Sequence, residues 1–333
     1  MDKQGLHNQT ALHEAAARGL VDTVATLLAE GAAPGARLKD GRNAIHLAAN
    51  WGHPSVIKLI FDKDRALARE LLKQPGGDWD DMPIHSAAFG GPDVVDILWR
   101  LGANLEARQK TSGTALHLAC QHGRPHAALK LLVLGARPDA LEEANMTPLH
   151  LAAHNGHVVI IQLLIHYCRE ISGYLEFRCK PKGNTALHLA ATCTFGYKPS
   201  YNPYIPIPGS LRNQSYLECF KILYEAGAAI CAANDLGETS LHLAATAGNL
   251  DIINFILGHL SETEESKVLR QLTLDHKHTP LHKAVNEDHL DVVRRLLEAG
   301  SDPNQKTGDG KSALQLAERK GDILKLLSSS SLG

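Results

Sequence analysis

The sequence has few aromatic residues and no strong excess of charge of either sign. Aromatic side chains make up 5% of its 333 residues, and the formal net charge is −2 at pH 7. Proteins that bind nucleic acid usually carry a marked basic excess or a basic stripe, so we expect no nucleic-acid partner. The longest predominantly apolar run, residues 158–165, is far too short to span a bilayer. We therefore expect no insertion into a membrane.

Cysteines are few and their spacing is uninformative. None of the six forms a C-x-x-C pair, which argues against a zinc site and against a disulfide framework. Free thiols favour a reducing compartment, and the first residues, 1–4, do not resemble a signal peptide. These features predict an intracellular protein of the cytoplasm, with the nucleus as the alternative.

The sequence also lacks the common motifs of catalysis. It contains no glycine-rich phosphate loop, no H-E-x-x-H and no nucleophile elbow. The acidic residues Asp78, Asp80 and Asp81 do not have the spacing of a calcium-binding EF-hand loop. We therefore predict no enzymatic activity, no cofactor and no bound metal.

What the chain does contain is one seven-residue motif, repeated along its length. The clearest copy is T-P-L-H-L-A-A at residues 147–153, and eight variants begin at residues 10, 43, 82, 114, 185, 239, 279 and 312. Four of the intervals are 32 or 33 residues, and the other four are 39, 38, 54 and 40. A period of this size is typical of a stacked array, in which each unit contacts its neighbours.

The motif contains the signals of a short helix. Thr147 suits the N-cap, because its hydroxyl can accept from free backbone N–H groups, and Pro148 suits the next position. The leucine and alanines of 149–153 share one helical face, and Gly156 can adopt the left-handed conformation that ends a helix. A second apolar stretch follows at 158–165. Each unit is predicted to be a helix, a turn, a second helix and a polar hairpin.

The motif T-P-L-H-x-A at this period resembles the ankyrin repeat, and the resemblance covers nearly the whole chain. It implies an all-α solenoid, with nine helix-turn-helix units joined by short β-hairpins in a single array over residues 1–333. It also implies a monomeric, non-enzymatic scaffold or adaptor. Such a scaffold would bind a protein partner on its concave face and at its hairpin tips. The resemblance does not identify that partner.

Eight histidines share the fourth position of the motif. A metal or catalytic site would need several of them to converge, whereas a stack spaces them one repeat apart. We therefore expect buried rings whose two nitrogens form hydrogen bonds to neighbouring turns. The residues are His13, His46, His85, His117, His150, His188, His242 and His282.

Candidate binding residues lie just before the end of each first helix. In an ankyrin-like stack this position lies on the concave surface, so the side chains would form one ridge along successive repeats. Aromatic residues there suit an interface, although local packing of Trp51 and Phe89 is the alternative. The candidates are Trp51, Phe89, Gln121, His122, His154 and Asn155.

Insertions are predicted near 62–80, 168–181, 194–214 and 259–275, and residues 328–333 read as a flexible tail. Helical composition is evident in the first insertion at 64–73 and in the last at 261–271. Trp79 lies in an acidic turn and either packs onto its own helix or faces a partner. The basic cluster at 178–182 reads as a solvated loop.

The largest insertion is rich in proline and tyrosine over residues 195–209. Its prolines exclude a regular helix. The segment is too apolar for ordinary disorder, so it either folds back over the stack or contacts a partner. Tyr201 and Tyr204 are the binding candidates in it.

Two other functions remain as hypotheses. The chain could be the targeting or regulatory module of a larger multidomain enzyme. The first repeat carries few polar residues on its outer side, around Leu12 and Val21, and terminal repeats are usually polar there, which favours a piece of a longer protein. The other hypothesis, an inhibitor of an intracellular transcription factor, rests on family analogy alone.

Overall fold

The computed structural model describes residues 8–192 and 209–330, which form 20 α-helices and one short 3₁₀ helix. The chain divides into two compact units. Unit 1 contains residues 1–152 and 162–170, and unit 2 contains residues 153–161 and 171–333. Helices α10 (Pro148–His154) and α11 (Val158–Tyr167) contribute residues to both units.

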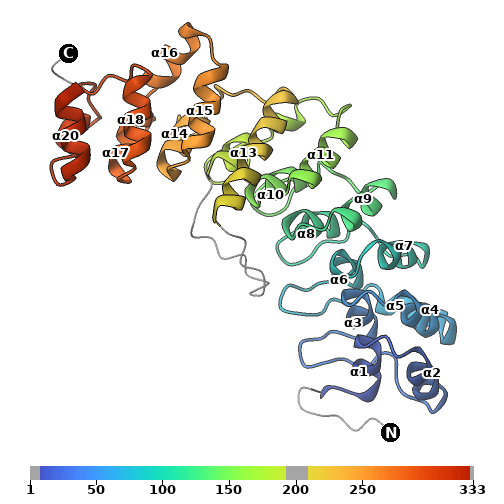
Figure 1. Ribbon diagram of the computed structural model, residues 1–333. Helices are drawn as coiled ribbons and strands as arrows, with labels where there is room; N and C mark the ends of the chain where they lie inside the picture. Colours follow the sequence, from blue (N-terminus) through green and yellow to red (C-terminus); the bar gives the residue numbers. More distant parts are fainter. Residues whose placement is uncertain (1–7, 193–208, 331–333) are drawn as a thin grey trace. The chain divides into compact units, whose positions relative to one another are not determined.

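Unit 1 consists of stacked helix pairs in two layers (Figure 1). The first helices of successive repeats, α1, α3, α6 and α8, pack on one another, and the second helices α2, α4, α7 and α9 form the other layer. The bounds are α1 Ala11–Ala17, α2 Val21–Ala29, α3 Ala44–Asn50, α4 Pro54–Lys63, α5 Arg65–Leu71, α6 Pro83–Gly90, α7 Pro92–Arg100, α8 Ala115–Gln121 and α9 Pro125–Val133.

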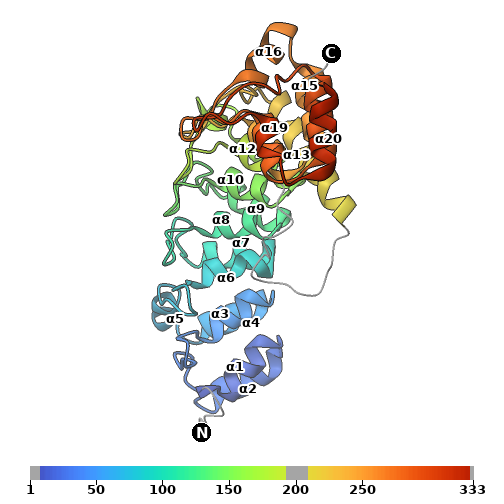
Figure 2. The ribbon, with the colours of Figure 1, turned by 90° about the vertical axis from the view of Figure 1, so that its left-hand side faces the viewer.

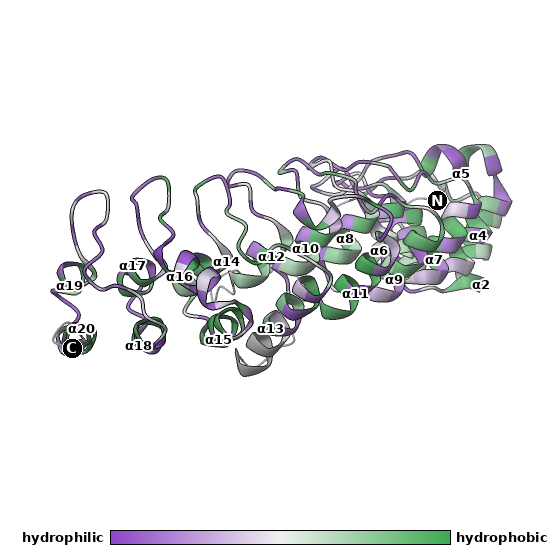
Figure 3. Cartoon of the chain, turned by 90° about the horizontal axis from the view of Figure 1, so that it is seen from above, coloured by the Kyte–Doolittle hydropathy of each residue, from purple (hydrophilic) through white to green (hydrophobic). Residues whose placement is uncertain are grey.

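Unit 2 has the same two-layer arrangement. Seen from above, α14, α17 and α19 lie in one layer, α15, α18 and α20 lie in the other, and mostly hydrophilic loops extend beyond the first layer (Figure 3). The bounds are η2 Tyr174–Glu176, α12 Ala186–Ala191, α13 Gly209–Glu225, α14 Ser240–Ala247, α15 Leu250–His259, α16 Glu262–Arg270, α17 Pro280–Asn286, α18 Leu290–Glu298, α19 Ala313–Leu316 and α20 Gly321–Ser330.

The core is built from the leucines and alanines of the motif. In the fourth repeat Leu116 and Ala119 are fully buried, and the small alanine side chains let neighbouring helices approach closely. The backbones of α3 and α6 approach closely, since a Cβ atom added to Gly90 would lie 1.8 Å from the carbonyl oxygen of Ala49. Only glycine fits at that point, so the end of α6 is fixed by backbone packing.

The hairpins of unit 1 project on one side of the helices (Figure 2). Each tip donates one backbone N–H to the preceding tip: Gly77 to the oxygen of Asp40 at 2.8 Å, Lys110 to that of Trp79 at 2.8 Å, and Glu143 to that of Thr111 at 3.0 Å. The expected β-hairpins are turns rather than paired strands, because the described residues contain three isolated β-bridges and no strand. One hydrogen bond per repeat is too few to build a sheet.

Two of the predicted insertions form helices. In the first, α5 follows Asp64, whose carboxylate accepts from the backbone N–H groups of Ala66 and Leu67, both at 3.0 Å. In the last, α16 follows Ser261, which forms a capping box with Glu264. Both helices are slightly shorter than the sequence predicts.

The basic residues at 178–182 are exposed, as expected of a solvated loop, but other residues of the segment 168–181 pack inward. Helix η2 places Tyr174 in the interior, where it is 4% exposed, and Cys179 is equally buried. Arg178 donates to the carbonyl oxygen of Ala233 at 3.0 Å and pairs with Asp235 at 3.1 Å. This arginine therefore joins two hairpins of unit 2.

The first residues of the predicted tail at 328–333 are helical. Helix α20 continues to Ser330, and Ser328 and Ser329 donate their hydroxyls back to the carbonyl oxygens of Leu324 and Leu326, both at 2.7 Å. Serine hydroxyls inside a helix commonly form such bonds to carbonyl oxygens of the preceding turn. Tyr201 and Tyr204 lie outside the described residues.

Candidate functional site

The repeated histidines form a structural network. In the fourth repeat, the backbone N–H of Thr114 donates to Nδ1 of His117 at 3.2 Å, and the Thr114 hydroxyl lies 2.9 Å from the same nitrogen. Nε2 of His117 lies 3.2 Å from the carbonyl oxygen of Met146 in the next hairpin. Because Nδ1 accepts, the proton belongs on Nε2, which donates to the carbonyl. Each ring thus joins its own helix cap to the next repeat.

Burial keeps these rings neutral. It lowers the pKa of six of them to about 4, since the charged form would lose its hydration. A ring with this pKa and two occupied nitrogens is a poor general base at neutral pH. The burial of the rings and the hydrogen bonds that they form confirm the prediction of a structural role. The six are His46, His85, His117, His188, His242 and His282.

The other metal-binding residue types are dispersed. Within the described part of the chain, no three His, Cys, Asp or Glu side chains are placed to hold a metal ion. Cys120 is fully buried, and burial raises the pKa of its thiol far above the usual range. None of the five cysteines among the described residues forms a disulfide.

Three of the predicted binding residues lie at successive first-helix ends in unit 1, and the ends of the first two approach closely, since a Cβ atom on Gly52 would lie 2.8 Å from the carbonyl oxygen of Gly90. Trp51 directly follows α3 and is 64% exposed. Phe89, half-buried near the end of α6, has its ring centroid 5.0 Å from that of His122, which follows α8. A fourth residue, Arg124, has its guanidinium carbon 6.0 Å from the centroid of the Phe89 ring. We call Trp51, Phe89, His122 and Arg124 the aromatic shelf; Gln121, half-buried at the end of α8, borders it.

The remaining ridge candidates belong to unit 2. His154 and Asn155 are half-buried at and just after the end of α10. Burial lowers the pKa of His154, and its carbonyl oxygen accepts from the Tyr216 hydroxyl at 3.0 Å. A single ridge through both units therefore stays a prediction.

Trp79 lies at a hairpin tip of unit 1. Its side chain is 57% exposed, and its carbonyl oxygen accepts from the backbone N–H of Lys110. The backbone of this tip is thus fixed to the next hairpin, while much of the indole surface faces solvent. This arrangement favours the second of the two alternatives for Trp79, contact with a partner.

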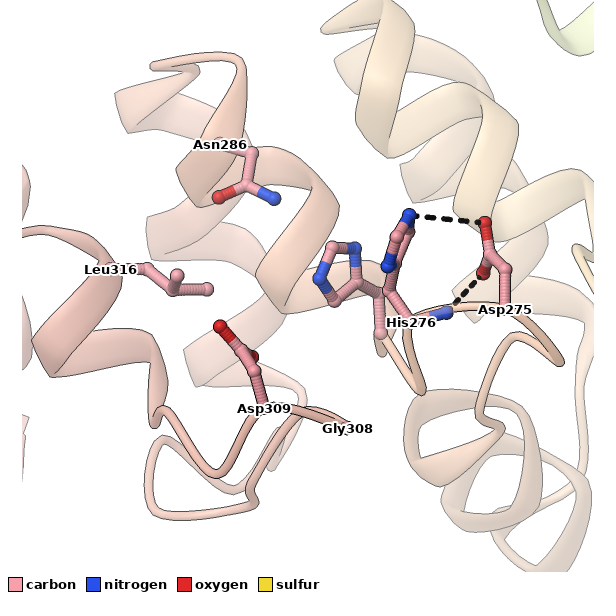
Figure 4. Close-up of a pocket in the computed structure, with 7 residues that line it drawn as sticks. Asp275, His276, Asn286, Gly308, Asp309 and Leu316 are labelled. Carbon is pink, nitrogen blue, oxygen red and sulfur yellow. Dashed lines mark hydrogen bonds and ion pairs between the residues drawn. The ribbon is translucent and has the colours of Figure 1, made fainter.

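Unit 2 has a hollow of about 520 Å³ between its last two hairpins. Figure 4 shows Asp309 and Leu316 at this hollow, with Asp275 beside His276. Both carboxylates already have partners. Asp275 accepts from the backbone N–H of His276 at 2.6 Å, and Asp309 lies 3.4 Å from the Lys311 ammonium. The hollow therefore presents no unpaired carboxylate to a ligand.

Comparison with known families places this architecture. Models described as ankyrin repeats match residues 1–67, 116–199, 210–257 and 269–317. The chain belongs to the ankyrin repeat family. The structure is similar to the solved structure of the human ASB11 ankyrin repeat domain, with a TM-score of 0.58 and 23% sequence identity. The match covers 75% of this chain and 98% of that domain. This likeness shows the fold alone.

The curated relatives are much longer proteins. An E3 ubiquitin-protein ligase of Arabidopsis thaliana, KEG, is 26% identical over 93% of this chain, which spans 20% of that ligase. The human palmitoyltransferase ZDHHC13 is 35% identical over 29% of this chain and 15% of its own length. Among the described residues of the ankyrin array, no helix has the length and apolar character needed to cross a membrane.

The sequence alone did not single out Arg124. In other ankyrin units of this chain, the residue just before the second helix ties that unit to the preceding one. His53 does so through the oxygen of Ala17 at 3.0 Å, and His289 through that of Thr246 at 3.0 Å. Arg124 occupies the same place before α9. The presence of arginine, where two other repeats have histidine, was the signal in the sequence that could have pointed to this residue.

Proposed function

We propose that this ankyrin array is a non-enzymatic scaffold that binds a protein partner through the first-helix ends and hairpin tips. The observation that carries the proposal is the aromatic shelf, where Trp51 is largely exposed one repeat before the ring pair of Phe89 and His122. Tryptophan and arginine are enriched at interface hot spots. Because the shelf stands on packed helix ends, little ordering entropy is lost when a partner binds.

Proximity labelling in the cells that produce the protein tests this proposal. The wild type is compared with Trp51→Ala/Phe89→Ala/His122→Ala, after checking that the melting temperatures match. Trp99→Ala is the matched control, because Trp99 is also exposed, at 43%, but lies on the second helix α7. We expect the triple variant to lose a labelled neighbour that both the wild type and the control retain. A neighbour set that the triple variant leaves intact contradicts the assignment to the shelf.

The second candidate is a targeting or regulatory module within a larger enzyme. The names and lengths of the relatives favour it, since the chain spans 20% of the ubiquitin ligase and 15% of the palmitoyltransferase. In that setting the array would bring a substrate or regulator to a catalytic domain elsewhere. Sequencing the full reading frame decides it, because a frame without a catalytic domain rules it out.

A further inference from the structure

Arg124 occupies a position that has a different role in two other repeats. His53 and His289, each the residue just before its second helix, reach the last part of the preceding first helix. A third donor, Tyr216, does the same from within α13. His53 donates to Ala17, Tyr216 to His154 and His289 to Thr246, each at 3.0 Å. All three carbonyls lie seven residues after the start of their motif. In two repeats, therefore, the residue just before the second helix links one repeat to the preceding one.

Arg124 does not make this link. The matching residue of the preceding repeat is Phe89, seven residues after the motif start at 82. The guanidinium lies over the Phe89 ring instead. In the ranges 8–192 and 209–330, no hydrogen bond or ion pair is formed by the guanidinium of Arg124, and the residue is exposed. Its N–H donors thus remain available to a partner.

Among the carboxylates that the structure describes, none lies within ion-pair distance of Arg124. Asp93, in the first turn of α7, is exposed, but it forms no ion pair with Arg124. The Phe89 ring under the guanidinium also contacts the ring of His122, and the exposed Trp51 lies at the first-helix end of the preceding repeat. The shelf therefore combines an unpaired positive charge with an apolar surface.

We propose that the partner of the shelf is an acidic segment, in which an Asp or Glu carboxylate pairs with Arg124 beside an apolar side chain on Trp51 and Phe89. The inference rests on the proposed binding function of the shelf. A guanidinium presents a planar fork of N–H donors that matches both oxygens of a carboxylate. Stacking over Phe89 holds this fork in place before the partner arrives, so less rotamer entropy is lost on pairing.

A phage-displayed library of random linear peptides, panned against the full chain, tests the inference. Peptides whose capture is lost with Trp51→Ala/Phe89→Ala are synthesised with a fluorophore, and their affinities are measured by anisotropy. We expect an acidic residue next to an apolar one in these peptides. Arg124→Gln should weaken binding about tenfold or more, and Arg124→Lys should recover only part of it because the fork is lost. Arg69→Gln, at an exposed arginine of α5, is the matched control.

A double-mutant cycle completes the test. Replacing the peptide's acidic residue by its amide should weaken binding to the wild type and leave binding to Arg124→Gln nearly unchanged. If shelf-dependent peptides are neutral or basic, or bind Arg124→Gln as well as wild type, the acidic-partner inference is wrong while the binding function stands. If no peptide depends on Trp51 and Phe89, both are overturned.

Discussion

The ring of His117 bridges the cap residue Thr114 and the carbonyl oxygen of Met146, each through one nitrogen at 3.2 Å. Replacing it by alanine leaves a buried N–H and a buried carbonyl without their partners and opens a cavity. We expect His117→Ala to lower the free energy of unfolding by about 2–4 kcal/mol. Chemical denaturation followed by circular dichroism measures this.

The ninth repeat provides the comparison variant. There Gln315 takes the place of histidine, and its amide oxygen accepts from the backbone N–H of Ser312 at 2.9 Å. His117→Gln should therefore keep the cap and lose only the bond to the next hairpin, at a cost of about 1 kcal/mol. Equal losses for the two substitutions would show that the cap bond contributes little.

The buried histidines also predict sensitivity to acid. The pKa of the His46 ring, like that of five others, is about 4 in the folded chain, below the ordinary value of 6.5. Between these two values the unfolded chain binds more protons, so stability falls as the pH drops from about 6.5 to about 4. Asp81 opposes this with one group, because burial raises the pKa of its carboxyl to about 6.

Denaturation at about pH 7 and about pH 5 checks the sign, and His117→Gln removes one of the titrating rings. The slope of stability against pH should become shallower by as much as one proton, about 1.4 kcal/mol per pH unit, in this variant. An unchanged slope would mean that burial does not lower the pKa of His117 in the folded chain.

Two helical glycines predict opposite responses to the same methyl group. At Gly90 the new Cβ would lie 1.8 Å from the oxygen of Ala49, whereas at Gly258, in α15, nothing lies within 4 Å. Gly90→Ala should destabilise the chain by about 1–3 kcal/mol or more, because α3 and α6 must separate. Gly258→Ala should stabilise it by up to about 1 kcal/mol through helix propensity. A melting temperature of Gly90→Ala that is equal to or above that of the wild type would contradict the packing of α3 on α6, and a lowered value for Gly258→Ala would contradict the propensity argument.

The sequence predicts the repeats well because their signals are local. A cap such as Thr114, the buried histidine three residues later and the closing Gly123 all lie within ten consecutive residues, so spacing alone places them. The two insertions that became α5 and α16 were readable for the same reason, through the caps Asp64 and Ser261.

The shelf could be read only in part. Trp51, Phe89 and His122 fall in recognisable positions, but the place of Arg124 over Phe89 depends on contacts between repeats 35 residues apart. The burial of Tyr174 likewise depends on how the loop at 168–181 packs, and its composition gives no sign of that. Long-range contacts of this kind leave no periodic pattern in one sequence.

Asp288 is in the position where several other repeats end the first helix with glycine, and its φ is +65°. Gly248 holds the same position in the preceding repeat with a φ of +70°. A side chain with a Cβ is strained there, so Asp288→Gly should raise the free energy of unfolding by about 0.5–1 kcal/mol. Glu287→Gly is the matched control, since its φ of −91° suits any residue. That change should lower stability through the extra freedom of the unfolded chain. Thermal melts of the two variants should shift in opposite directions, and a loss of stability in Asp288→Gly would show that the aspartate side chain supplies a cap worth more than the strain.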